Sequence, residues 1–228
     1  MIKQSLDAIL TEIVTACARV GRDPRSVTLI GVTKYSTADE VNAAIAAGLT
    51  AMAENRVQVA EEKFPLLISS GRCVTRHLIG HLQTNKVKDA VRLFDMIQSV
   101  DSLKLAAEIE KRAAAAGKVQ AILVQVDIAR EEQKFGVAEE DLDALMAYLD
   151  GCRHICTQGL MAMAPLTGDA AVVRCVFRRL KSLFDRLKSG RPAMQHLSMG
   201  MSSDYAIAIE EGATMVRIGS ALFKGAEK

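Results

Sequence analysis

The chain has 228 residues, of which half are hydrophobic, and its formal net charge is +2. This length can bury one large core, and α/β barrels often reach it as a single domain, so we expect one domain over residues 1–228. The near-neutral charge balance provides no basic footprint for nucleic acid or for an anionic membrane surface.

The five cysteines form an odd set without a CxxC pair. This pattern argues against a zinc site and predicts buried, reduced thiols in a cytoplasmic protein. The N-terminal stretch MIKQSLDAILTEI carries acidic residues and lacks the long apolar core of a signal peptide. No run of about 18 apolar residues is present to span a bilayer. We therefore expect a cytoplasmic protein whose partners include neither nucleic acid nor a membrane.

The first predicted element is a helix over residues 3–20, where apolar residues recur at helical spacing. An apolar, β-branched run over residues 27–35 then predicts a strand that is buried on both faces, with Lys34 at its C-terminal end. Thr37 and Glu40 have the spacing of a capping box, which predicts the start of the next helix.

Strand and helix alternate through the rest of the chain. Further strands are predicted over residues 49–55, 74–80, 94–100, 119–128, 154–161, 195–198 and 214–218. Helices are predicted between Thr37 and Gly48 and over residues 55–67, 84–91, 101–116, 139–149, 170–188 and 203–211. Alternation of this kind implies parallel strands joined by crossover helices.

The fold class that follows is α/β. Eight strand–helix units after a leading helix predict a closed (β/α)8 TIM barrel with an extra N-terminal helix. A doubly wound open sheet is the alternative, but the glycine fingerprint of a dinucleotide fold is missing after the first strand. In a barrel, functional residues lie at the C-terminal ends of the strands.

Two loops at those strand ends suit an anion. The loop after the seventh strand reads SMGMSSD, and the loop after the eighth reads RIGSA. Exposed N–H groups and hydroxyls at such turns bind phosphate, which makes Ser202, Gly219 and Ser220 a candidate cradle. Each of them taken singly is also an ordinary helix N-cap signal. Lys34 either reaches water as a cap on the strand or serves chemically, because burying an unpaired ammonium is costly.

A lysine and a phosphate cradle in one barrel mouth are what pyridoxal 5′-phosphate (PLP) requires, because the lysine forms a Schiff base and the helix N-terminus anchors the phosphate. Arg217 lies on the same strand face as Gly219 and would either face the pyridine nitrogen or pair with Glu210, Glu211 or another carboxylate at the barrel mouth. His77 is either near the cofactor or packed within its strand. The methionines near the strand ends are interpreted as core residues: Met161, Met163, Met194, Met199 and Met201.

The chain resembles the pyridoxal phosphate homeostasis proteins in six blocks: GVTKYSTADEV, ENRVQ, HLIGHLQTNK, QVDIAREEQKFG, GLMAMAP and LSMGMSSDYAIAIEEGATMVRIGSALF. These are single-domain proteins similar to the N-terminal barrel of bacterial alanine racemase, the fold-type III class of PLP proteins. The blocks occur in the same order and run from about residue 27 to residue 224.

The cofactor-binding residues that the resemblance implies are Lys34, Asn55, His77, Ser202, Arg217, Gly219 and Ser220. In this assignment Lys34 carries the Schiff base, Arg217 faces the pyridine nitrogen, and the two serines with Gly219 hold the phosphate. By sequence position, Lys86 is the nearest rival for the Schiff base. The resemblance also implies no established catalytic turnover and no metal. It implies a carrier or regulator of the PLP pool, with apo PLP-dependent enzymes as recipients.

Two other functions are considered. A PLP-dependent amino-acid racemase needs an acid or base on each face of the α-carbon. The resemblance to alanine racemase implies that a tyrosine from a second, C-terminal domain would serve one of these faces. The chain ends within about ten residues of the cradle, so we expect little or no racemisation. A barrel without a cofactor, which regulates partners through its surface, is the third interpretation. We expect a monomer.

Overall fold

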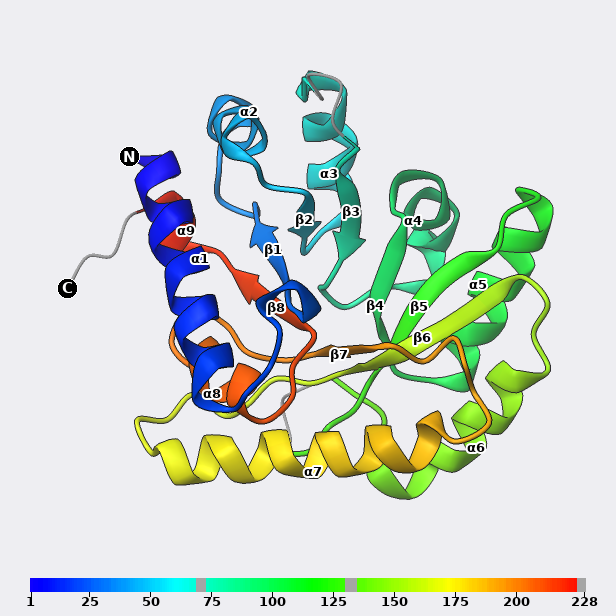
Figure 1. Cartoon of the computed structure of the whole chain (residues 1–228). Coiled ribbons are helices and arrows are strands. Elements are labelled where there is room, and N and C mark those ends of the chain that lie inside the picture. The colour runs from blue at the N-terminus through cyan, green and yellow to red at the C-terminus, as the bar shows by residue number, and fades with distance from the viewer. Residues whose placement is uncertain (69–72, 130–134, 225–228) are drawn as a thin grey trace.

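A computed structural model of the protein describes residues 1–68, 73–129 and 135–224. Its strands are β1 (Thr28–Val32), β2 (Ala51–Glu54), β3 (Thr75–Leu78), β4 (Met96–Val100), β5 (Gln120–Gln125), β6 (Ile155–Met161), β7 (His196–Ser198) and β8 (Met215–Ile218). They are parallel and close into one barrel in chain order, with helices around it (Figure 1). The closed barrel predicted from the alternation is confirmed. Residues 130–134 of the block QVDIAREEQKFG and residues 225–228 lie outside the described residues.

The α-helices are α1 (Ile2–Arg19), α2 (Ala38–Ala47), α3 (Val57–Lys63), α4 (Val87–Leu93), α5 (Leu103–Ala115), α6 (Glu139–Asp150), α7 (Ala170–Lys188), α8 (Tyr205–Glu210) and α9 (Ser220–Phe223). Short 3-10 helices cover Pro24–Ser26, Phe64–Leu66 and Thr84–Lys86. The predicted extra N-terminal helix is α1, which packs against α2, α8 and α9 (Figure 1). The first helix therefore lies beside the last one.

The first strand is shorter than the predicted range 27–35. It ends at Val32, and the chain turns immediately afterwards, because the Ser36 N–H donates to the Thr33 carbonyl at 3.0 Å. Lys34 consequently lies in a turn at the barrel mouth instead of on the strand. The predicted capping box follows this turn and is confirmed by reciprocal hydrogen bonds between Thr37 and Glu40.

The predicted helix over residues 55–67 is divided in two. Its α-helical part ends at Lys63, and a 3-10 turn follows. Pro65 lies in this turn and has no N–H to donate, so it does not continue the α-helical hydrogen-bond pattern. The division shortens α3 and brings Lys63 to its last turn.

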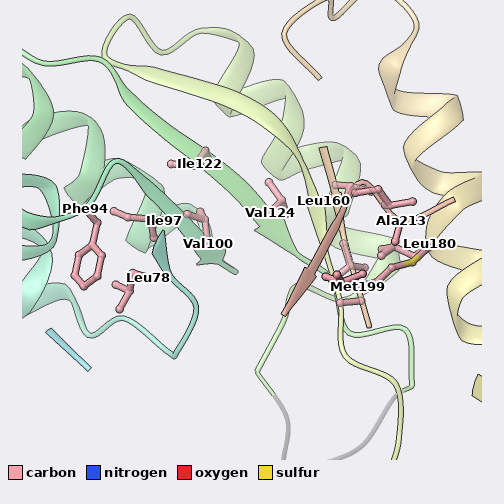
Figure 2. Close-up of a cluster of buried hydrophobic side chains, with 14 of the residues drawn as sticks. Leu78, Phe94, Ile97, Val100, Ile122, Val124, Leu160, Leu180, Met199 and Ala213 are labelled. Carbon is pink, nitrogen blue, oxygen red and sulfur yellow. The ribbon is translucent and has the colours of Figure 1, made fainter. Parts of the chain in front are cut away.

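The hydrophobic core has two parts, because successive residues on a strand point to opposite faces. The outer part lies between the strands and the helices; Figure 2 shows a section of it around Phe94, Ile97 and Leu160. The inner part fills the barrel with Ile30, Ala51, Ala53, Met96, Leu123, Met161 and Met215. The barrel interior also holds a set of buried polar side chains, which are described below with the candidate site.

Three structural facts bear on the expected partners and surroundings. Within the ranges that the structure describes, no helix is both long and apolar enough to cross a membrane. In the same ranges, no group of three or more histidine, cysteine and acidic residues is arranged to hold a metal ion. All five cysteines are free, but the expectation that they are buried was wrong for Cys73 and Cys175, which are exposed.

Candidate functional site

A cavity of about 470 Å³ opens at the C-terminal ends of the strands. Its volume is within the range of small-molecule sites, which is about 300–1,000 Å³. Six of the seven predicted cofactor residues line it: Lys34, Asn55, Ser202, Arg217, Gly219 and Ser220. His77 does not line the cavity. The structure therefore brings together residues from the loops after β1, β2, β7 and β8 with one residue of β8.

Lys34 presents a free primary amine at the cavity mouth. Its side chain is exposed, and the Nζ atom lies 4.9 Å from the centre of the Tyr35 ring. The preceding residue, Thr33, is fully buried, and its backbone N–H donates to the Ala53 carbonyl at 2.9 Å. An exposed side chain thus follows a buried, hydrogen-bonded residue of the backbone.

A buried ion pair between Glu54 and Lys63 holds the backbone of Thr33 in place. The Lys63 ammonium donates to Glu54 Oε1 and to the Thr33 carbonyl, at 2.6 Å in each case. The Thr33 hydroxyl donates to the same Glu54 oxygen at 2.6 Å. Glu54 has no exposed surface, and its other oxygen, Oε2, has no hydrogen-bond partner. Glu54 and Lys63 therefore attach the residue before Lys34 to β2 and α3.

Asn55 follows β2 and lines the cavity, and its buried side-chain oxygen, Oδ1, has no hydrogen-bond partner among the described residues. Buried polar atoms in proteins are nearly always paired, so an unpaired oxygen on a lining residue marks Asn55 as a candidate ligand contact. The Asn55 backbone is packed directly against Gly80. A Cβ atom at position 80 would lie 2.2 Å from the Asn55 carbonyl oxygen, which is closer than any real contact.

We expect Gly80→Ala to displace the Asn55 segment and to lower the free energy of unfolding by about 1–3 kcal/mol, because the added methyl group overpacks the contact. Urea unfolding measures this loss. Gly168→Ala is the matched control, since a Cβ atom there would meet no heavy atom within 4 Å. Equal stability of the two variants would contradict the expectation.

Arg217 contributes a buried cation to the cavity. It is 3 % exposed; Nη1 donates to Ser198 Oγ at 2.7 Å and Nη2 donates to the Ala162 carbonyl at 3.0 Å. Burial lowers the pKa of Arg217 to about 10, while Asp204 opposes this shift, so the guanidinium stays charged at neutral pH. No carboxylate within residues 1–68, 73–129 and 135–224 forms an ion pair with it.

The predicted alternative for Arg217 was a salt bridge to Glu210, Glu211 or another carboxylate at the barrel mouth. Both of these carboxylates instead pair with Arg174 on α7, at 2.7 and 2.5 Å. The guanidinium of Arg217 therefore remains available to the cavity.

His77 lies in the barrel interior, where it is 4 % exposed. Its Nδ1 atom is 3.0 Å from Gln98 Nε2, and its Nε2 atom is 3.1 Å from the Thr75 hydroxyl. Burial is the main cause that lowers the pKa of His77 to about 4; Asp95 raises it and His196 lowers it further. His77 is thus a neutral, packed side chain, which was one of its two predicted interpretations.

We expect acid to destabilise the protein through His77. The unfolded chain takes up a proton near pH 6.5 and the folded chain only near pH 4, so stability is lost as the pH falls between these values. The loss from this group is about 3 kcal/mol. The free energy of unfolding, measured in urea across this pH range, should fall less steeply with falling pH for His77→Gln than for the control, His81→Gln. Burial also lowers the pKa of His196, which adds its own fall in the free energy of unfolding to all proteins compared.

The candidate phosphate cradle combines two turns. Ser202 lies in the turn before α8, which is held by a hydrogen bond of 2.5 Å from the Met201 N–H to Asp204 Oδ1. Gly219 precedes α9, and Ser220 is its first residue. The first N–H groups of a helix have no intrahelical partner, so they and the serine hydroxyls can face an anion.

Sequence reasoning missed several residues of the site. Met163 and Met201 are half-buried and line the cavity, although they were interpreted as core residues. Met161, Met194 and Met199 are buried core residues as predicted, and Met161 also lines the cavity. Lys224 also lines the cavity. Lys86, the predicted rival of Lys34, lines a neighbouring cavity of about 440 Å³. The sequence signal that could have placed these methionines at the cavity is the position of Met161 and Met163, two residues apart at the C-terminal end of a strand.

Comparison with known proteins shows the family of the chain. Residues 5–227 match the family described as alanine racemase, N-terminal domain. The pyridoxal phosphate homeostasis protein of Aquifex aeolicus is 39 % identical over 221 residues, which cover 96 % of each chain. That of Haemophilus influenzae is 36 % identical over 224 residues, covering 97 % of this chain and 94 % of the relative. The chain belongs to the pyridoxal phosphate homeostasis protein family.

Solved structures agree with this family assignment. PipY of Synechococcus elongatus, whose structure has PLP bound, is 35 % identical with a TM-score of 0.84; the alignment covers 98 % of this chain and all of PipY. A protein of unknown function from Bifidobacterium adolescentis has a TM-score of 0.92 at 33 % identity, over 97 % of this chain and 94 % of that one. Alanine racemase of Clostridium difficile shares the barrel fold, with a TM-score of 0.68 at 14 % identity.

Proposed function

We propose that this chain binds PLP in the barrel-mouth cavity, with Lys34 as its covalent anchor, and that it stores or delivers the cofactor without turnover. One observation carries the proposal: an exposed primary amine lines the same cavity as a buried guanidinium that has no ion-pair partner among the described residues. The names of the relatives, and the PLP bound to PipY, support the choice of ligand.

The residues present fit PLP. Lys34 would supply the primary amine that holds the PLP aldehyde as a Schiff base, with water as the other product. Arg217 would supply hydrogen-bond donors to the pyridine nitrogen, and Asn55 would line the bound ring. Ser202, Gly219 and Ser220 would hold the phosphate.

The same residues argue against a racemase. A guanidinium beside the pyridine nitrogen disfavours protonation of that nitrogen and weakens the ring as an electron sink. Tyr35 is the tyrosine that lines the cavity, and it neighbours Lys34 in sequence, so the described cavity offers no separate tyrosine for the opposite face. Incubation of the purified protein with PLP and L-alanine should give no steady formation of D-alanine, and a steady enzymatic rate would overturn the carrier proposal.

The direct test is a visible absorption spectrum of the protein mixed with PLP, followed by borohydride reduction and peptide mass mapping. We expect a yellow imine band and one reduced adduct, on Lys34. A colourless mixture, or an adduct spread over surface lysines, would refute the proposal and favour the interpretation as a cofactor-free surface regulator.

A storage or delivery role requires that the site can be reached from water. Lys34, Tyr35 and Ser220 are all exposed, so bound PLP could leave without unfolding of the barrel. Apo PLP-dependent enzymes as recipients, a monomeric state and a cytoplasmic location all stay predictions. Transfer of PLP to an apo-enzyme in the presence of a scavenger of free PLP tests the first of them.

A further inference from the structure

A chain of buried polar side chains crosses the barrel interior beneath the cavity. It begins at Arg217 on β8, passes through Ser198 on β7 and Gln98 on β4, and ends at His77 and Thr75 on β3. The successive donor–acceptor distances are 2.7, 2.7, 3.0 and 3.1 Å. Ser198 and Gln98 have no exposed surface. Neither residue lines the cavity.

Chemistry determines the direction of every bond in this chain. A guanidinium can only donate, so Ser198 Oγ accepts a hydrogen bond from Arg217. The Ser198 hydroxyl in turn donates a hydrogen bond to Gln98 Oε1. The amide nitrogen of Gln98 therefore faces His77, whose Nδ1 atom accepts. The second N–H of this amide faces Met215 Sδ at 3.8 Å. The proton of His77 is then on Nε2, towards Thr75.

This arrangement has a specific consequence for Arg217. A carboxylate in place of the Gln98 amide would also accept from Ser198, but it would neutralise the positive charge at the cavity. The amide orients the guanidinium and leaves its charge unpaired. Because a buried polar group without a partner is costly, each member holds the next in one orientation.

We propose that Gln98 and Ser198 are positioning residues that hold the Arg217 guanidinium towards the cavity, and that His77 sets the orientation of the Gln98 amide. This inference rests on the proposed function, in which Arg217 contacts PLP. It assigns roles to three residues that do not line the cavity.

The variant that tests it is Gln98→Met, which keeps the side-chain volume and removes both the acceptor and the donor. The matched control is Gln120→Met, because Gln120 is also fully buried but donates only to the Asp95 and Ala121 carbonyls. Both variants lose buried hydrogen bonds, so unfolding in urea should show a lowered stability for both.

The first readout uses the protein without PLP. Hydrogen exchange of the Arg217 guanidinium, followed by NMR and assigned by its absence in Arg217→Met, should be slow in the wild type. We expect Gln98→Met to raise this exchange rate by about tenfold or more, because the guanidinium loses the acceptor that Gln98 holds in place. Gln120→Met should leave the rate within about twofold. An unchanged rate in Gln98→Met would overturn the proposal whether or not PLP binds.

The second readout is PLP affinity in a double-mutant cycle. Gln98→Met should raise the dissociation constant of PLP by about tenfold in the presence of Arg217 and by less than about twofold in the Arg217→Met background. Equal losses in both backgrounds would mean that Gln98 acts only on overall stability, and would overturn the proposal. If the wild type binds no PLP, the proposed function fails. The exchange rates alone then decide whether the hydrogen-bonded side chains of Ser198 and Gln98 hold Arg217 in place.

Discussion

Lys34→Ala is expected to abolish the borohydride-reducible PLP adduct completely. The reason is chemical: alanine has no amine to condense with the aldehyde. Non-covalent binding should persist at lower affinity, because Ser202, Gly219, Ser220 and Arg217 are unchanged. The free energy of unfolding should stay within about 0.5 kcal/mol of the wild type, since the Lys34 side chain is exposed. Mass mapping of reduced peptides and urea unfolding measure the two quantities.

The control for this variant is Lys224→Ala. Lys224 lines the same cavity and is the structural rival of Lys34, whereas Lys86 lies in the neighbouring cavity. We expect Lys224→Ala and Lys86→Ala to keep the adduct on Lys34. A full adduct in Lys34→Ala that disappears only in the double variant with Lys224→Ala would transfer the anchor to Lys224.

Lys63→Met is expected to lower the free energy of unfolding by about 3–5 kcal/mol, because it leaves the carboxylate of Glu54 buried without its counter-ion. Among the described residues, the hydrogen bond then remaining to Glu54 Oε1 comes from the Thr33 hydroxyl. Urea unfolding at neutral pH measures this change. Since the Lys63 ammonium also donates to the Thr33 carbonyl, the turn that carries Lys34 should loosen and adduct formation should slow.

Two further variants isolate the cause. Lys118→Met removes another half-buried ammonium, but one that donates only to the Val91 and Phe94 carbonyls, so we expect a smaller loss of about 1–2 kcal/mol. Glu54→Leu combined with Lys63→Met removes both charges and should recover much of the lost stability. If the double variant is no more stable than Lys63→Met alone, the buried charge is not the cause.

The order of the elements could be predicted because each depends on local chemistry. The capping box of Thr37 and Glu40 marks the start of α2, and the alternation of apolar runs with helical patterns requires a parallel sheet. The ends of elements were less predictable. Lys34 was placed on the first strand, since hydropathy does not show that the Thr33 carbonyl accepts from Ser36 and turns the chain.

The candidate site was predictable to the extent that its residues follow strand ends. Lys34 follows β1, Asn55 follows β2 and Arg217 lies on β8, and they line one cavity because the C-terminal ends of the strands converge in a parallel barrel. His77 was placed beside the cofactor by resemblance, but the register that pairs it with Ala53 and Met96 sets it deeper in the barrel. Gln98 and Ser198 carried no motif, because a single polar residue in an apolar strand has no recognisable spacing.

The sequence by itself determined the fold class, the family and the lysine, arginine and serines that face the cavity, because these depend on residue order and on short-range patterns. The tertiary structure alone decided which charges remain unpaired. Glu210 and Glu211 pair with Arg174, which leaves Arg217 without an ion pair among the described residues, and Glu54 meets Lys63 through the packing of α3 on β2. Ion pairing depends on distances between atoms of separate elements, and only the closed barrel sets those distances.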